Sequence, residues 1–267
     1  MPLSPEHKEI LLTQSESKTL PEWEQYFNGL YSKKMIYDCC HNHKKKVKPR
    51  SVEEISKTQS QNARKYHINQ DYFKTWSHNM AYILGLWFAD GCIYKGKMFD
   101  ITLHAKDKYI LRKIKEELGY EGNLYDYVDR QAARINFSCK VIYNDLIALG
   151  GQEHKSLTIS FPSVPKEFLS DFIRGYFDGD GSIMRMKNNR LNSAFCCGSK
   201  SFLISLLKVL KEEAGIIGGS FDDSSMTLRF GKNDTLRLCE YMYKNNPELF
   251  LLRKYEKYLS YKEDNLI

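Results

Sequence analysis

Two stretches of the sequence decide the fold, MAYILGLWFADG at residues 80–91 and DFIRGYFDGDG at residues 171–181. In the first, Gly85 and Ala89 are four residues apart, and in the second Gly175 and Gly179 have the same spacing. Residues four apart share one face of a helix, and a face of very small side chains lets two helix backbones approach closely. Large apolar residues fill the other positions of both stretches. The repeat therefore predicts two buried, tightly paired helices.

Both predicted helices end on an acid, Asp90 in the first and Asp180 in the second, 90 residues apart. The C-terminal end of a helix carries partial negative charge, so an anion there is unfavourable. Two such acids at matched ends of paired helices repel each other unless a cation lies between them. Mg²⁺ takes hard oxygen ligands and phosphate oxygens, and two carboxylates that hold it form a site for phosphodiester hydrolysis. The alternative is a purely structural helix pair with glycine C-caps at Gly91 and Gly181.

The segments that follow the two helices repeat as well. Each predicts a strand hairpin, a helix, a second hairpin and a closing helix, and strands such as residues 99–104 alternate apolar and polar side chains. That alternation is typical of a sheet with one face on a core and one face in water. We expect an α+β chain with two pseudo-symmetric αββαββα halves, whose antiparallel four-stranded sheets form a saddle. The expected parts are a helical segment at 1–76, a first half at 77–150, a crossover linker at 151–167 and a second half at 168–267.

The segment 1–76 is basic, with 13 Lys and Arg against 9 Asp and Glu. Helices are expected over residues 20–28 and 33–42 with a break at Gly29, which is the spacing of a helix-turn-helix. A basic run over residues 43–50 follows and includes Lys44, Lys45 and Lys46. Two interpretations stay open. The segment is either an accessory DNA-binding module whose second helix enters a major groove, or a helical hairpin with a solvated run of charge.

Composition bounds the compartment and the partners. The 267 residues carry a net charge of +7 with a mean hydropathy of −0.52. The uncharged stretch at residues 80–89 is about half the length of a membrane span, and no secretory signal is visible. The seven cysteines include no Cys-x-x-Cys pair, which disfavours a zinc ribbon or a disulfide framework. We expect an intracellular, cytoplasmic protein, nucleoid-associated in a bacterial or phage host, with no membrane partner. The basic excess permits nucleic acid as partner.

On these residues the chain resembles the LAGLIDADG homing endonucleases, because residues 83–91 and 173–181 are similar to two copies of that family's nine-residue motif. The resemblance implies a monomer that lays two sheets in the major groove of double-stranded DNA and cuts both strands across the minor groove. It implies Mg²⁺ as cofactor, with Mn²⁺ or Ca²⁺ able to occupy the same sites. Asp90 and Asp180 match the family's metal-binding catalytic acids. Ala89 and Gly179 match the positions whose backbone carbonyls help to hold the metal.

The same family places a basic residue near the metals, after the fourth strand of each half. Lys140 lies 50 residues after Asp90, and Lys232 lies 52 residues after Asp180. A cation there could stabilise charge on the transition-state phosphate or lower the pKa of an attacking water. The alternative is a surface lysine that opens a helix. The second motif copy has Asp178 where the first has Phe88, and we expect Asp178 to be a polar helix-end residue rather than a ligand.

DNA recognition is expected from the wet faces of the two sheets, where Arg and Lys side chains can pair with base edges. The candidates are Arg130, Arg134, Arg185, Lys187, Arg190 and Arg229. Because the two halves differ in these residues, the target should be a long asymmetric sequence rather than a palindrome.

The predicted function is therefore site-specific, metal-dependent cleavage of double-stranded DNA. Three alternatives remain. Two keep the fold without cleavage, as an RNA-binding maturase that contacts intron RNA or as a DNA-binding regulator. The third is an invertase or repressor built on the N-terminal segment alone. Origin in an intron, an intein or a free-standing gene stays open.

Overall fold

The computed structural model describes residues 3–51, 54–55, 66–187 and 189–265. The chain divides into two compact units, Met1–Ala63 and Arg64–Ile267, and each unit has its own hydrophobic core. None of the helices in the described ranges is long and apolar enough to span a bilayer.

The N-terminal unit contains α1 (Pro5–Thr13), α2 (Leu20–Tyr26) and α3 (Lys33–Asn42). Polar residues start these helices: Ser4 and Ser32 accept bonds from first-turn amides, and Thr19 forms a capping box with Glu22. The apolar faces of the three helices meet in a core of Leu11, Trp23, Phe27, Tyr31, Ile36 and Cys40. The two helices predicted for this segment are therefore present, separated by a turn that contains Gly29 in a left-handed conformation.

The second unit contains two halves with the same order of elements. The first half comprises α5 (His78–Asp90), β1 (Gly91–Tyr94), β2 (Met98–His104), α6 (Lys108–Glu117), β3 (Tyr125–Tyr127), β4 (Ala132–Ser138) and α7 (Lys140–Ala148). The second half comprises α8 (Leu169–Asp180), β5 (Gly181–Arg185), β6 (Leu191–Cys196), α9 (Lys200–Glu213), β7 (Ser220–Asp222), β8 (Thr227–Phe230), α10 (Lys232–Met242) and α11 (Leu252–Asp264). This order confirms the predicted α+β class with two αββαββα halves.

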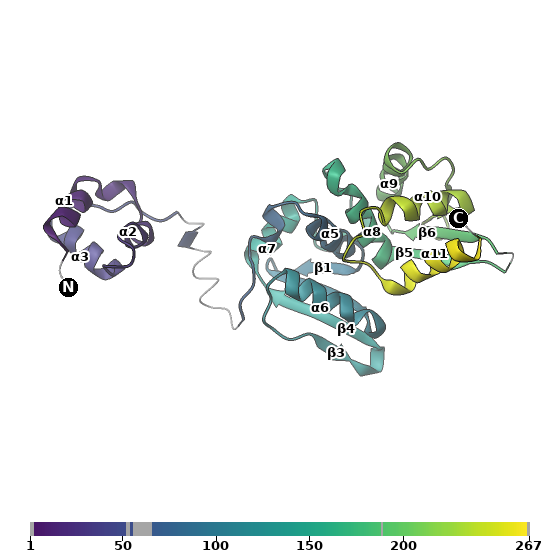
Figure 1. The fold of residues 1–267 in the computed structure, drawn as a ribbon, viewed down its shortest axis with the longest axis horizontal. Helices are drawn as coiled ribbons and strands as arrows, with labels where there is room; N and C mark the ends of the chain where they lie inside the picture. Colours follow the sequence, from purple (N-terminus) through teal and green to yellow (C-terminus); the bar gives the residue numbers. More distant parts are fainter. Residues whose placement is uncertain (1–2, 52–53, 56–65, 188, 266–267) are drawn as a thin grey trace. The chain divides into compact units, whose positions relative to one another are not determined.

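The two antiparallel sheets have equivalent strand orders, β1-β2-β4-β3 and β5-β6-β8-β7. Buried residues pair across the central strands of each sheet, as Ile101 does with Ile135 and Phe195 with Leu228. The helices α5 and α8 lie side by side at the centre of the unit, with one sheet belonging to each half (Figure 1). The site must therefore be sought along this central helix pair.

Glycine makes the close contact between α5 and α8. A Cβ added to Gly85 would lie 2.0 Å from the carbonyl oxygen of Phe172, and a Cβ added to Gly175 would lie 2.0 Å from that of Tyr82. No side chain fits in either place, so the backbones can approach this closely only at glycine. Gly179 faces Ala89 in the same way one turn further on, so the two helices run parallel. The predicted tight pairing is confirmed, and it brings both C-terminal helix ends to one pole.

The boundary between the units differs from the predicted one. The sequence predicted that the N-terminal segment would end at residue 76, whereas the compact unit ends at Ala63. Ile68 and Phe73 are buried in the core of the second unit, and Trp76 stacks on Phe168 with ring centroids 6.0 Å apart. The prediction was wrong here because these apolar residues lie in an irregular stretch, where hydrophobic periodicity gives no signal.

Candidate active site at the paired helix ends

Asp90 is the last residue of α5 and Asp180 is the last residue of α8. The chain leaves each helix directly into a strand, so neither acid is covered by a continuing helix. Asp90 is exposed and Asp180 is half-buried. A Cβ added to Gly179 would lie 3.0 Å from a carboxylate oxygen of Asp90, so the end of α8 lies against that carboxylate. The parallel pair thus presents one acid from each half at the same pole.

Both carboxyl groups have raised pKa values. Partial loss of solvent, together with the neighbouring Asp180 carboxylate, raises the pKa of Asp90 to about 6. Loss of solvent also raises the pKa of Asp180, while the ammonium groups of Lys155 and Lys254 act in the opposite direction. Two carboxylates in a partly desolvated place are compensated most directly by a cation between them.

Lys155 reaches the end of α5 from the segment that the sequence predicted to be a linker. It begins the short 3₁₀ helix η5 (Lys155–Leu157), and only 7% of the residue is exposed. Its Nζ donates to the carbonyl oxygens of Phe88 at 2.7 Å and Ala89 at 3.1 Å. Burial lowers the pKa of Lys155, and the carboxylates of Asp180 and Asp90 oppose that shift.

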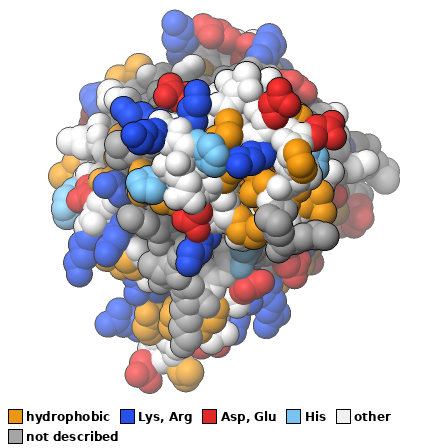
Figure 2. Space-filling view, turned by 90° about the vertical axis from the view of Figure 1, so that its left-hand side faces the viewer, with side chains coloured by type: hydrophobic (Ala, Val, Ile, Leu, Met, Phe, Trp, Pro, Cys, Tyr) orange, Lys and Arg blue, Asp and Glu red, His pale blue; other side chains and the backbone are white. Residues whose placement is uncertain are grey.

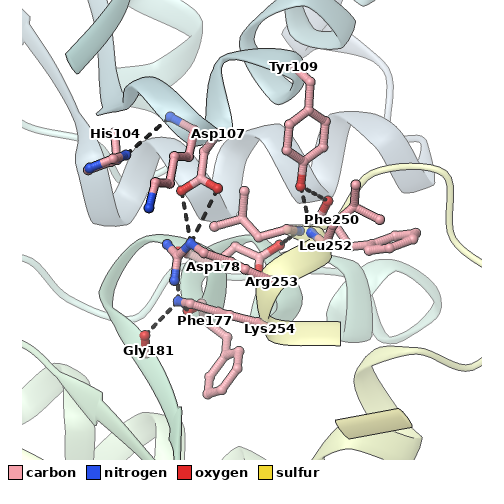
Figure 3. A network of polar contacts seen from close by, with 12 residues as sticks. His104, Asp107, Tyr109, Phe177, Asp178, Gly181, Phe250, Leu252, Arg253 and Lys254 are labelled. Atoms are coloured by element: carbon pink, nitrogen blue, oxygen red, sulfur yellow. Dashed lines mark hydrogen bonds and ion pairs between the residues drawn. The ribbon is translucent and has the colours of Figure 1, made fainter. Parts of the chain in front are cut away.

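Lys254 occupies the equivalent place at the end of α8 and comes from the first turn of α11. It is 3% exposed, and its Nζ donates to the carbonyl oxygens of Phe177 at 2.5 Å, Asp178 at 2.8 Å and Gly181 at 2.5 Å. Figure 3 shows this ammonium group among the carbonyls. Burial lowers the pKa of Lys254 to about 8, with the Asp178 carboxylate opposing the shift.

These two lysines resolve the electrostatic conflict of an acid at a helix C-terminus. Each ammonium group donates to carbonyls at the C-terminal end of its helix, and each offsets the negative end of the helix dipole. Their charges also act on both Asp90 and Asp180. The arrangement is repeated in the two halves, one acid and one buried lysine at each helix end.

The two lysines predicted from the sequence are both the first residues of helices. Lys140 is the exposed first residue of α7. Lys232 is the first residue of α10, and its Nζ lies 5.8 Å from the ring centroid of Tyr261. The structure thus places Lys155 and Lys254, rather than Lys140 and Lys232, at the helix ends. Lys140 and Lys232 open helices, and a part for them in catalysis stays a prediction.

Asp178 has a structural part in holding the site together. Its buried carboxylate accepts from the Tyr82 hydroxyl of α5 at 2.8 Å and from the Leu251 amide at 2.8 Å. The matching residue of the first half, Phe88, packs edge-on against Phe172 with ring centroids 5.4 Å apart. The same motif position therefore joins the two helices through a hydrogen bond in one half and through an aromatic contact in the other.

On the sheet of the first half, Arg134 is held by its neighbours. It forms an ion pair with the buried Asp100, in which its Nε lies 2.6 Å from Oδ2. The same guanidinium donates to the hydroxyls of Tyr127 at 3.1 Å and Tyr94 at 3.2 Å. Asn136 also donates to Asp100, at 3.0 Å. Arg134 is therefore the centre of a polar network on this sheet rather than a loose surface cation.

The other predicted DNA-binding residues are more exposed. Arg229 pairs with Asp222 at 3.0 Å and keeps 56% of its side chain exposed, and Arg185 pairs with Asp264 at 2.5 Å. The remaining candidates on the two sheets are exposed at or near hairpin turns; they are Arg130, Lys187 and Arg190. The second half thus presents more freely accessible cations than the network around Arg134.

The predicted basic run of the N-terminal unit is exposed at Lys44, Lys45 and Lys46, directly after α3. A hollow of about 570 Å³ lies beside it and combines apolar and cationic lining, with Tyr37 and Val47 next to Lys45, Lys46 and Arg50. Figure 2 shows one face of the molecule, on which Lys, Arg and His side chains lie among hydrophobic and acidic ones. Such a mixture suits contacts to both phosphates and bases.

The residues at the helix ends fit a divalent metal ion. In the part of the chain that the structure describes, no group of three or more His, Cys, Asp or Glu side chains could hold a metal by itself. Mg²⁺ needs fewer, because it is commonly held by one or two carboxylates with water and substrate phosphate completing its shell. Asp90 and Asp180, two carboxylates at the same pole whose pKa values are raised first by burial, meet that need. The Ala89 carbonyl, predicted as a further ligand, already accepts a bond from Lys155.

A hollow of about 400 Å³ opens beside Asp180 and the end of α5. Its lining includes Ala89, Lys155, Asp180 and Cys197. It therefore connects the helix ends and one of the buried lysines to solvent, and it has room for a phosphate group.

Residues 77–146 match the family model described as the LAGLIDADG-like domain. The first half is therefore similar to the LAGLIDADG-like domain over about a quarter of the chain. The second half repeats its order of elements, and together they have the fold of solved meganucleases. The I-SmaMI meganuclease bound to uncleaveable DNA superposes with a TM-score of 0.50 at 13% identity, over 69% of this chain and 89% of that one. A double mutant of I-SmaMI gives 0.50 at 12% identity, over 72% and 91%. The resemblance drawn from the two motif copies is confirmed at the level of this fold.

Two curated proteins of Methanocaldococcus jannaschii share sequence with part of the chain. The probable translation initiation factor IF-2 is 29% identical over 135 residues, which is 47% of this chain and 11% of that protein. The DNA-directed RNA polymerase subunit Rpo1C is 27% identical over 113 residues, which is 40% of this chain and 13% of that protein. The chain thus spans about a tenth of the length of these relatives, and the matched segment is a small part of each.

Proposed function

We propose that the protein is a site-specific endonuclease that cuts double-stranded DNA as a monomer with the help of divalent metal. One observation carries the proposal: an acid and a buried lysine stand at each of two matched helix ends, facing the same pole. Two equivalent sets of groups suit a substrate with two equivalent scissile bonds, which is what a DNA duplex offers. The similar I-SmaMI structure was solved with DNA bound, which supports the same class of substrate here.

In this proposal Asp90 and Asp180 hold Mg²⁺, and Mn²⁺ or Ca²⁺ can take the same place. The chemistry that Mg²⁺ supplies when bound is a lowered pKa of a water and neutralised charge on the phosphate. Lys155 and Lys254 keep the helix ends in place through their bonds to terminal carbonyls. Their charges also lower the electrostatic cost of placing a phosphate beside two carboxylates.

DNA would lie along the two sheets. The exposed cations Arg130, Lys187 and Arg190 provide phosphate contacts, while Arg134 and Arg229 are set in polar networks that favour defined base contacts. Because those networks differ between the halves, the target is asymmetric. The N-terminal unit, with Lys44, Lys45 and Lys46 beside α3, acts as an accessory DNA anchor.

The protein is further proposed to belong to a mobile element. Segments similar to it occupy about a tenth of two M. jannaschii proteins with different names. A segment that recurs as a small part of otherwise different proteins is expected of an inserted element, and an endonuclease that cuts a long target is the activity such an element needs.

The proposal is tested with Asp90→Asn and Asp180→Asn. Duplexes cut by the parent protein in Mg²⁺ are first selected from a randomised fragment library, and single-turnover cleavage of one such duplex is then measured. Each variant keeps the shape of the side chain but loses the charge that holds the metal, so each should lower the cleavage rate at least about hundredfold.

Asp126→Asn is the matched control, because Asp126 pairs with Lys108 on the surface at 2.6 Å and lies outside the site. Its cleavage rate should equal that of the parent. Variants of Asp90 and Asp180 that cut as fast as the parent would reject the catalytic assignment. A parent protein that selects no duplex but binds structured RNA tightly would favour the maturase.

A further inference from the structure

Residues 248–254, here called the strap, comprise the end of the connection between α10 and α11 and the first turn of α11, and they lie against the first half. Lys113 of α6 donates to the carbonyl of Glu248 at 2.8 Å. The Tyr109 hydroxyl donates to the carbonyl of Phe250 at 3.1 Å and accepts from the amide of Leu252 at 2.5 Å. The strap belongs to the second half in sequence, yet these bonds tie its backbone to a helix of the first half.

The last of these ties is an ion pair next to the active-site lysine. Arg253 donates through Nε to both carboxylate oxygens of Asp107, at 3.0 and 3.3 Å. Asp107 stands at the N-terminal end of α6 and is buried, but its side chain makes no capping bond to that helix. Its carboxylate is therefore directed to Arg253, as Figure 3 shows.

On its other side the strap holds the end of α8. Leu251 donates its amide to Asp178, and Lys254 donates to the carbonyls of Phe177, Asp178 and Gly181. Within residues 250–254, Phe250, Leu252 and Arg253 thus contact Tyr109 and Asp107 of the first half, while Leu251 and Lys254 contact the end of α8. The position of Lys254 depends on both.

We propose that Asp107, through Arg253, is a positioning residue of the first half that sets Lys254 at the catalytic centre of the second half. This inference deepens the proposed function and rests on it. The physical reason is that a charge-assisted bond to a buried carboxylate fixes the residue adjacent to Lys254, and an ammonium group that donates to three carbonyls tolerates little displacement. Cleavage of one DNA strand thereby depends on the correct placement of the opposite half.

The other buried lysine has a different support. Glu153, two residues before Lys155, accepts from the Gly96 amide at 3.1 Å and from the Tyr143 hydroxyl at 3.0 Å. Both partners belong to the first half, and among the described residues neither forms a hydrogen bond to the strap. Loss of the bond between Asp107 and Arg253 should therefore leave Lys155 in place. This difference makes the proposal testable strand by strand.

The experiment measures single-turnover cleavage of a selected duplex whose two strands carry different fluorophores. Lys254→Met and Lys155→Met first assign each strand to one lysine. Asp107→Asn and Arg253→Gln should each slow the strand assigned to Lys254 about tenfold, with the other strand and the DNA affinity unchanged. The double variant should lose no more than either single one, because both remove the same bond. Arg253→Lys, which can keep the ion pair, should restore most of the rate.

Two comparisons separate positioning from general damage. Asp126→Asn removes the carboxylate of a surface pair near the start of α6 and should slow neither strand. Hydrogen exchange of residues 248–256 should accelerate in Asp107→Asn but not in Asp126→Asn, whether or not DNA is cut. Equal slowing of both strands, or unchanged exchange in the strap, would overturn the inference. A parent protein that cuts no duplex, with faster strap exchange in Asp107→Asn, would reject the proposed function and keep the structural link.

Discussion

The two helix ends of the candidate site have the same chemistry but obtain it from different parts of the chain. Lys155 comes from the segment between the halves and lies 65 residues after Asp90, whereas Lys254 comes from α11 and lies 74 residues after Asp180. Lys155 follows a residue that bonds to the first half, and Lys254 follows a strap that bonds to both halves. The comparison teaches that equivalent side chains in a repeat must occupy equivalent positions in space, whereas the segments that hold them there can differ.

Removing either ammonium group should have the largest effect on the cleavage rate and so gives the strongest test of this comparison. Lys155→Met and Lys254→Met keep the apolar stem and should each slow cleavage about hundredfold, because the charge that offsets the phosphate is lost. The losses should fall on opposite strands. Strand-resolved cleavage of a selected duplex measures this. Equal loss on both strands from either variant would mean that the two ends do not act separately.

The helix contact itself should be equivalent in the two halves. Gly85→Ala and Gly175→Ala each force a methyl group against a carbonyl oxygen, so each should lower the free energy of unfolding by about 3 kcal/mol. Urea denaturation measures this effect. Gly231→Ala, at a glycine with open space around it, should cost no more than about 1 kcal/mol, which reflects only its position as N-cap residue of α10. If Gly85→Ala and Gly175→Ala lowered the free energy of unfolding by very different amounts, one helix would be able to shift away from the added methyl group.

The two sheets, unlike the two helices, should differ in how much stability an arginine on each of them contributes. Arg134→Gln leaves the buried Asp100 without its cation and should cost about 2 kcal/mol of stability. Arg229→Gln removes an exposed pair and should cost less than about 0.5 kcal/mol. Thermal and urea unfolding measure both. Similar costs for the two variants would mean that the network around Arg134 adds no stability.

The sequence predicted most of the fold and half of the site. The spacing of Gly85, Ala89, Gly175 and Gly179 predicted the helix pair. The alternation of apolar and polar residues predicted the strands of the sheets. Both could be predicted because both are local patterns in the sequence. The acids followed from the same repeat. Lys140 and Lys232 were chosen by their distance from the acids, and distance along the chain does not report which side chain reaches a helix end.

Of the two lysines at the helix ends, one could have been predicted from the sequence and the other could not. Lys254 shares a helical stripe with Tyr258 and Tyr261, all three buried, so a lysine at a core position of α11 was a visible signal. Lys155 lies in an irregular segment with no periodicity, and only its contacts in space show its place. The boundary at Ala63 escaped prediction for the same reason.

The buried ammonium groups also define where a functional half ends. Each half reaches completion only at a lysine that lies beyond its third helix, seven residues after Ala148 in one case and twelve after Met242 in the other. A gene fragment cut at the last helix of the repeat would encode a folded shape with uncovered helix carbonyls and a bare acid. A half that ends at its third helix therefore lacks the group that offsets its acid, and a functional half includes the segment up to its lysine.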